Sequence, residues 1–267
     1  MIDLHTHVLP RIDDGPASME EAVALARAEA DDGIVQMAAT PHLRSDHPGV
    51  DPAKLRGQCD ELNSRLRRRN VPVEVVPGGE VDIYWAQTAS EDLLKAASYG
   101  QRGRYLLVET PYGALPDGFE NLLFQLTARE FGILLAHPER SPSFQRHPER
   151  LEALVRSGIL LQITAAALVD SPRRSASRRL AEAMVAERRA HVVATDAHGI
   201  RLRRSASLSL AAAAADRLAA GQGRRMTKEI PAAILAGDDV PPVTPRTRPR
   251  LADRLRQAIS SRSSAPP

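Results

Sequence analysis

Short apolar runs, several of them rich in β-branched residues, alternate with longer helical patterns along this chain. Seven of these runs predict strands, at residues 2–5, 35–40, 73–81, 104–110, 133–137, 159–164 and 191–198. Between the runs lie segments with the spacing of amphipathic helices. Strands that alternate with helices in this way are typical of βαβ units and a parallel sheet.

The helix predicted after the first strand has the clearest boundaries. Ser18 and Glu21 have capping-box spacing at its start, and Gly33 stands where it should end. Further helices are expected at residues 51–69, 120–132, 148–158 and 177–189. Seven strands with crossovers favour an α/β fold of the TIM-like barrel type with one unit missing, and a doubly wound open sheet is the alternative.

Length and composition indicate a globular protein. The chain has 267 residues, 43% of them hydrophobic, which is enough for one large core. No run approaches the roughly 18 apolar residues of a membrane helix, so we expect no membrane insertion. The start of the chain has no secretory pattern, and a single cysteine excludes an intrachain disulfide framework. We therefore expect a cytoplasmic location.

The positive charge is concentrated at the end of the chain. Residues 244–267 contain six arginines and one aspartate, a net +5, so residues 1–243 carry about −2 of the formal +3. We predict a single barrel domain over 1–243 and a flexible basic tail rich in Pro, Arg and Ser over 244–267. With only 3% aromatic residues the chain has few side chains for base stacking, and we expect no nucleic-acid partner.

Metal-binding side chains stand at the carboxyl ends of six of the seven predicted strands. In chain order they are His5 with His7, His42, Glu80, Glu109, His137, and Asp196 with His198. A single histidine or glutamate at a strand end is usually only solvated. Barrel enzymes build their sites from these ends, so the repetition predicts that the side chains meet in a metal centre.

The motifs around these residues resemble a known family. DLHTHVLPRIDDGP, ATPH, GGEV, VETPYG, AHPER and ATDAHG follow one another between residue 1 and about residue 205. Together they resemble the polymerase and histidinol phosphatase (PHP) superfamily. Within it they are most similar to the bacterial manganese-dependent protein-tyrosine phosphatases of capsule and exopolysaccharide synthesis. The resemblance implies a distorted (β/α)7 barrel, the PHP fold, that holds three metal ions.

The resemblance also implies a role for each matching residue. One metal would be bound by His5, His7 and Asp196, and Glu80 would bridge it to a second metal completed by Glu109 and His137. The third would be held by Asp14, His42 and His198. Asp13 would support the site without binding metal, and Arg140 and Arg203 would bind phosphate. Arg11 departs from the family pattern, because a glycine is common at its position.

This ligand set has a charge that suits a phosphatase. Three divalent ions with five neutral imidazoles and four carboxylates leave about +2, which fits a phosphate dianion. Oxygen and nitrogen ligands without thiolate are compatible with manganese, iron or zinc. We expect three divalent ions, with manganese the first choice.

The predicted activity is a metal-dependent hydrolysis of protein phosphotyrosine. The expected substrate is a bacterial tyrosine kinase, or its phosphorylated tail, that regulates capsular or exopolysaccharide synthesis. A small phosphomonoester such as histidinol phosphate is the alternative. An amidohydrolase that cleaves C–N bonds would share the His-x-His start but usually uses a lysine at a strand end, and a regulatory module would be expected to lose ligands.

Cys59 and Arg65 match the C-x5-R pattern of thiolate phosphatases. The mechanism of those enzymes needs a loop whose free backbone N–H groups bind phosphate. CDELNSR has no glycine and lies in a predicted helix, so we interpret the match as a coincidence.

Four aromatic residues that follow strand ends could line a substrate groove or pack in the core: Tyr84, Trp85, Tyr112 and Phe119.

Overall fold

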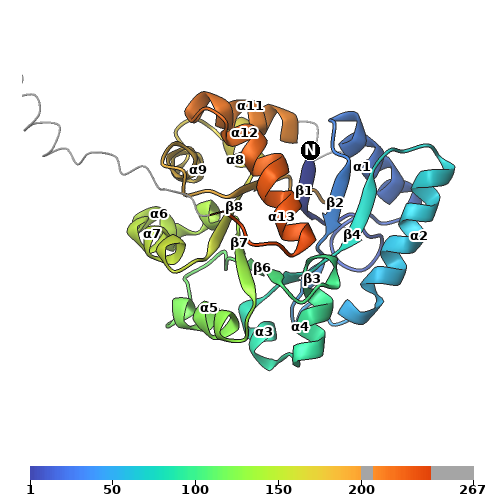
Figure 1. The fold of residues 1–267 in the computed structure, drawn as a ribbon, viewed down its shortest axis with the longest axis horizontal. Helices are drawn as coiled ribbons and strands as arrows, with labels where there is room; N and C mark the ends of the chain where they lie inside the picture. Colours follow the sequence, from blue (N-terminus) through green and yellow to red (C-terminus); the bar gives the residue numbers. More distant parts are fainter. Residues whose placement is uncertain (200–206, 242–267) are drawn as a thin grey trace, which may run out of the picture.

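Seven parallel strand paths surround a common centre in this computed structural model, which describes residues 1–199 and 207–241 (Figure 1). Two paths are interrupted, so nine strands are distinguished: β1 (Ile2–Thr6), β2 (Gln36–Ala39), β3 (His42–Leu43), β4 (Glu74–Pro77), β5 (Glu80–Val81), β6 (Tyr105–Glu109), β7 (Gly132–Ala136), β8 (Leu160–Thr164) and β9 (Val192–Ala194). They form a sheet β1-β2-β4 and a sheet β3-β5-β6-β7-β8-β9. A parallel bridge between Thr6 and Ala197 joins the first path to the last. The predicted α/β barrel is confirmed.

The two interruptions correct the prediction of unbroken strands at 35–40 and 73–81. Pro41 separates β2 from β3 because proline has no N–H to donate to a ladder. Gly79 separates β4 from β5, and a Cβ there would lie 2.4 Å from Cδ1 of Leu43. The breaks let β3 and β5 continue as a separate pair in which His42 lies opposite Glu80.

The five predicted helices are all present, as α1 (Met19–Asp31), α2 (Leu55–Arg68), α5 (Phe119–Ala128), α7 (Glu149–Arg156) and α9 (Ala176–Ala186). The Ser18 side chain accepts a hydrogen bond from the Glu21 N–H at 3.2 Å, and Gly33 follows the last turn with φ 87°. Helices that the sequence pattern did not predict are α3 (Ile83–Thr88), α4 (Glu91–Ala97), α6 (Pro142–Arg146), α8 (Ala165–Val169), α11 (Leu208–Leu218), α12 (Gln222–Arg224) and α13 (Ile230–Ala236). Single turns lie at Pro52–Lys54, Tyr99–Gln101, Pro138–Arg140 and Arg225–Glu229.

The core has two parts. The larger one lies between strands and surrounding helices, and the smaller one contains inward-facing strand residues such as Leu4, Leu107 and Leu134. Ile230 and Ile234 of α13 join the smaller part, so this helix packs across the amino-terminal end of the barrel, as Figure 1 shows. The opposite end, where the strands finish, is left for the functional site. None of the helices in the described ranges is long and apolar enough to cross a membrane.

Candidate metal centre

The structure brings all nine predicted metal ligands together at the carboxyl ends of the strands. They form four overlapping groups, and the ligand atoms within each group lie within 4.8 Å of one another. The groups are His5 with His137 and Asp196; His5 with His7 and Glu80; His42 with Glu80 and Glu109; and His7 with Asp14, His42 and His198. The residues come from six strand paths, as the sequence predicted.

The end of β1 directs two imidazoles into the centre. Nε2 of His5 lies 3.3 Å from Nε2 of His7, and 3.3 Å from Oδ1 of Asp196. The far side of each ring is held by another residue. Nδ1 of His5 lies 3.1 Å from Oε1 of Gln162, and Nδ1 of His7 lies 2.7 Å from Oδ2 of Asp13. Such contacts orient a ring and set which nitrogen is available to a metal.

The loop after β1 is shaped around Asp13. Its carboxylate accepts hydrogen bonds from the backbone N–H of Gly15 at 3.1 Å and of His42 at 3.2 Å, in addition to its contact with His7. A Cβ on Gly15 would lie 2.2 Å from the carbonyl oxygen of His7, so only glycine fits. Arg11 has φ 62°, which explains why glycine suits its position. Asp13 thus lies behind His7, where the sequence interpretation placed it.

Glu80 is the central carboxylate of the cluster. Its Oε1 lies 2.9 Å from Nε2 of His137, and its Oε2 lies 3.4 Å from His5 and 2.9 Å from Nδ1 of His42. The contact between Oε2 of Glu80 and Nδ1 of His42 does not have the geometry of a hydrogen bond. Among the described residues, these two atoms and Nδ1 of His137 are buried without a hydrogen-bond partner. Buried polar atoms normally have partners, so these orphaned atoms fit residues that bind cations.

A second cluster reaches the surface at the mouth of the barrel. Oδ1 of Asp14 lies 3.2 Å from Nε2 of His198 and 3.6 Å from Nε2 of His42. The rings of His198 and His7 stack with centroids 3.9 Å apart. Asp14 is more than half exposed, whereas Glu80 is buried. The site therefore extends from a buried centre to solvent.

The site stabilises positive charge strongly. Burial opposes the protonation of His5, but the carboxylates of Glu80 and Asp196 outweigh it and raise the pKa of His5 to about 9. Burial likewise opposes ionisation of Glu80, yet His5 and the other surrounding imidazoles hold the pKa of Glu80 well below its usual value. Burial also works against ionisation of Asp196, whose pKa is lowered by His5 and His7. Divalent cations compete with protons for such ligands.

Of the two predicted phosphate-binding arginines, Arg140 borders this site. Its Nη1 lies 2.7 Å from Oδ2 of Asp196 and donates a hydrogen bond to the Tyr112 hydroxyl at 3.1 Å. The left-handed conformation of His137, with φ 36°, starts the single turn Pro138–Arg140 that directs this side chain. Arg203 lies outside the described residues.

The sequence profile of the family described as capsular polysaccharide synthesis, CpsB/CapC, matches residues 1–236. The chain belongs to the CpsB/CapC family. It is 34% identical over 207 residues to the tyrosine-protein phosphatase YwqE of Bacillus subtilis, covering 76% of this chain and 79% of YwqE. It is 29% identical to the tyrosine-protein phosphatase CpsB of Streptococcus pneumoniae, covering 61% of this chain and 67% of CpsB.

The solved structures agree with this family. A chain from the crystal structures of YwqE and of S. pneumoniae CpsB, metal-dependent tyrosine phosphatases, superposes with a TM-score of 0.79 and 29% identity. The superposition covers 93% of the present chain and all of the solved one. The barrel described above is therefore the CpsB/CapC barrel, and the predicted resemblance is confirmed.

Three residues of this CpsB/CapC site were not found from the sequence. Gln162 contacts His5 from β8, the strand whose end carries no predicted ligand. Nη1 of Arg44 donates to both oxygens of Glu109, at 3.1 and 3.2 Å. The ring of His47 stacks on the ring of His42 with centroids 5.3 Å apart. Gln162 could have been found from the period of two along its strand, but the other two lie in a loop without a pattern.

The cysteine motif plays no part in the site. Cys59 is buried in α2, and burial raises the pKa of its thiol to about 12. A thiol with this pKa is not a nucleophile at neutral pH. The interpretation of C-x5-R as a coincidence is confirmed.

Of the four aromatic residues that follow strand ends, Phe119 is buried in the core, whereas Tyr84 and Tyr112 are exposed.

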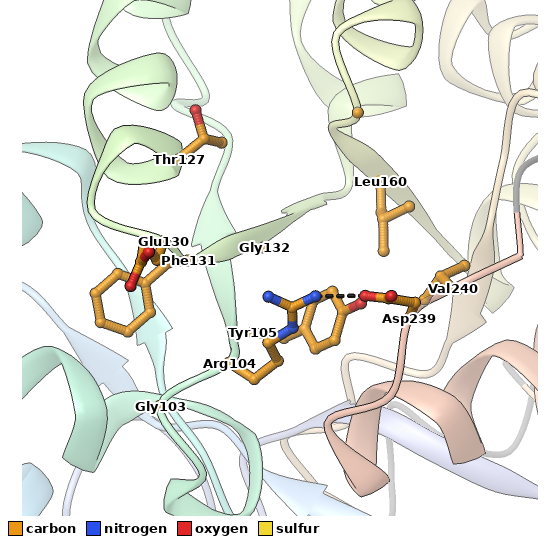
Figure 2. A pocket seen from close by; sticks show the side chains of 11 residues that line it. Gly103, Arg104, Tyr105, Thr127, Glu130, Phe131, Gly132, Leu160, Asp239 and Val240 are labelled. Carbon is orange, nitrogen blue, oxygen red and sulfur yellow. Dashed lines mark hydrogen bonds and ion pairs between the residues drawn. The ribbon is translucent and has the colours of Figure 1, made fainter.

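A cavity of about 710 Å³ lies at the opposite end of the barrel, near the amino ends of β6, β7 and β8. Figure 2 shows Arg104 facing Asp239 across it, with Tyr105 beside them. The Tyr105 hydroxyl donates to the carbonyl of Asp238 at 2.9 Å, so the segment after α13 forms one wall. Within the described residues, the clustered metal-type ligands lie at the other end.

Proposed function

We infer that this protein is a metal-dependent tyrosine-protein phosphatase of the CpsB/CapC family of capsular polysaccharide synthesis. The observation that carries this conclusion is the meeting of five imidazoles and four carboxylates at the strand ends. The relatives YwqE and CpsB are tyrosine-protein phosphatases, and the chain shares the family profile over most of its length. No cysteine nucleophile is needed.

We propose that the site holds three divalent ions, with manganese preferred and iron or zinc compatible with the ligands. The donor atoms fit, since they are nitrogen and oxygen only, and the nine ligands fall into four overlapping groups along the site rather than into one. Glu80 is the proposed shared ligand because it is the one carboxylate of the nine ligands that belongs to two of the four groups, and its two oxygens face different imidazoles. We propose that each ion has its own further ligands. The first ion would be held by His5, His7 and Asp196, the second by Glu109 and His137, and the third by Asp14, His42 and His198.

The metal ions, when bound, make water nucleophilic at neutral pH and stabilise the in-line displacement at phosphorus. The residues of the chain bind and orient the substrate. Arg140 borders the ligand cluster, and its planar guanidinium can donate to two phosphoryl oxygens. Arg203 is proposed to add a second such group. Both neutralise charge that moves onto the phosphoryl oxygens in the transition state.

We propose that the physiological substrate is the phosphorylated tail of a tyrosine kinase in capsule or exopolysaccharide synthesis. The family description supports a role in this process. The exposed Asp14 and Tyr112 show that the site opens to solvent, so a phosphotyrosine on an extended segment can reach it.

A substrate panel tests the proposal. The protein is reconstituted with Mn²⁺ and assayed with a phosphotyrosyl peptide, a phosphoseryl peptide and histidinol phosphate. We expect the highest kcat/KM with phosphotyrosine and no turnover after chelation. A higher kcat/KM with histidinol phosphate would contradict the proposed substrate, and full activity after chelation would contradict the metal mechanism.

A further inference from the structure

Tyr112 lies at the mouth of the site, and it is neither one of the nine predicted metal ligands nor one of the two predicted phosphate-binding residues. It follows β6 by three residues, and its ring stacks on that of His137 with centroids 5.6 Å apart and planes inclined by 22°. It is 56% exposed. One face of the ring is thus held by the site while other parts remain open to solvent.

The hydroxyl of Tyr112 touches the group proposed to bind phosphate. It accepts the hydrogen bond from Nη1 of Arg140 at 3.1 Å. The same Nη1 lies 2.7 Å from Asp196, so the arginine is held between a tyrosine and a carboxylate. A phosphoryl group bound by Arg140 therefore lies close to the hydroxyl end of Tyr112.

We propose that Tyr112 determines the preference for aryl over alkyl phosphates. Its exposed ring stacks on the phenyl ring of phosphotyrosine, and its hydroxyl positions Arg140. The inference rests on the proposed function, and it names one residue as responsible for the preference of the phosphatase for phosphotyrosine. Because the phosphoryl group is bound inside the site, the phenyl ring must extend toward the mouth, where Tyr112 lies. Aromatic rings attract each other in offset or edge-to-face pairs, whereas an alkyl phosphate offers no ring.

The two roles of Tyr112 predict different results for different substitutions. Tyr112→Phe keeps the ring but removes the hydroxyl, so binding of aryl and alkyl compounds should weaken by the same factor of about three to ten. Tyr112→Leu removes the ring, so the preference for the aryl compound should also fall by about three- to tenfold.

Binding of phenylphosphonate and methylphosphonate to the Mn²⁺-loaded protein, measured by calorimetry, tests this. Neither compound is hydrolysed, and the ratio of their dissociation constants does not depend on the fraction of protein loaded with metal. Tyr84→Leu is the matched control: Tyr84 is 57% exposed and makes no ring contact or hydrogen bond to a predicted ligand within the described residues. Should Tyr112→Leu fail to fold, Tyr112→Met removes the ring with a more flexible side chain.

We expect the wild type, Tyr112→Phe and Tyr84→Leu to share one ratio of aryl affinity to alkyl affinity, the inverse of the ratio of dissociation constants, and we expect a lower ratio in Tyr112→Leu. An unchanged ratio in Tyr112→Leu, or an equal fall in Tyr84→Leu, overturns the inference. The kcat/KM values for phosphotyrosyl and phosphoseryl peptides separate this outcome from failure of the proposed function. If the wild type prefers phosphotyrosine but Tyr112→Leu keeps its ratio, only the inference fails. If the wild type hydrolyses no phosphotyrosine, the proposed function fails.

Discussion

The barrel has an Arg–Asp ion pair near each end of its strands, and the two pairs have different surroundings. Arg104 pairs with Asp239 at the amino ends, where the aspartate side chain is 91% exposed. Arg140 pairs with Asp196 at the carboxyl ends, where the aspartate side chain is 6% exposed and also faces His5 and His7. The carboxylate of Asp239 is open to water, whereas the charge of the buried Asp196 carboxylate is stabilised by Arg140 and the two imidazoles around it.

This difference shows why only one end is suited to chemistry. An exposed ion pair contributes little because water already stabilises each charge. Buried charges need partners, and several buried ionisable groups in one place indicate a functional site. Substitutions at the two ends should therefore differ greatly in their effects on activity.

The largest effect is expected from Glu80→Gln, which removes the carboxylate proposed to be shared between two ions. Phosphatase activity should fall by about 10³-fold or more, because the charge that stabilises the transition state depends on bound metal. Metal content by elemental analysis should fall in parallel, and His42→Ala should lose part of the metal.

The matched control at the other end is Asp239→Asn, which should keep both activity and metal content. Wild-type metal content in Glu80→Gln would contradict the assignment of Glu80 as a ligand.

Arg140→Ala should have the next largest effect, a loss of about 10²-fold in kcat/KM. Its metal content should stay near the wild-type value, because an arginine is not a ligand. Lysine at this position should restore only part of the activity, since it lacks the planar fork. Arg203→Ala is expected to behave like Arg140→Ala. Arg104→Ala, at the solvated end, is the control. Equal losses of kcat/KM in Arg104→Ala and Arg140→Ala would contradict the predicted difference between the two ends.

A smaller effect is expected on the pH dependence of stability in the chelated protein. The pKa of His5 is about 9 in the folded protein and about 6.5 in an unfolded chain. The contribution of His5 to the free energy of unfolding is therefore complete below pH 6.5 and is lost as the pH rises through 9. The loss is on the order of 3 kcal/mol.

Urea unfolding of the chelated protein at pH 6.5 and pH 9 measures this loss. His5→Gln should remove part of the pH dependence, because the carboxylates of Asp13, Asp196 and Glu80 also raise the pKa of the buried His7. His147→Gln, at an exposed histidine, should retain it. A wild-type free energy of unfolding that rises between these pH values would contradict the predicted sign.

The smallest effect on activity is expected from Cys59→Ser. The thiol lies in α2, away from the strand ends, and its pKa of about 12 keeps it protonated. Activity should remain near that of the wild type, with a loss of stability of about 1 kcal/mol from burying a hydroxyl group. Assay and thermal unfolding of the same preparation check both values. Loss of turnover at full metal content would mean that the thiolate motif is functional.

The sequence by itself determined the alternation of strands and helices and the positions of the ligand-type residues at the strand ends. Both follow from local rules. Apolar periodicity and caps such as Ser18 define elements over a few residues, and parallel strands bring their carboxyl ends to one edge whatever lies between them. For this reason all nine predicted ligands meet in the structure, although their metal-binding roles remain predictions.

Only the tertiary structure decided which side chains support these residues. Gln162 reaches His5 across 157 positions, Arg44 reaches Glu109 across 65, and Tyr112 reaches Arg140 across 28. Such pairs exist only because the barrel closes and its loops fold over the mouth, and no local pattern encodes a contact between distant loops. The breaks at Pro41 and Gly79 also needed the structure, because the fit of Gly79 depends on Leu43, a residue of the neighbouring strand.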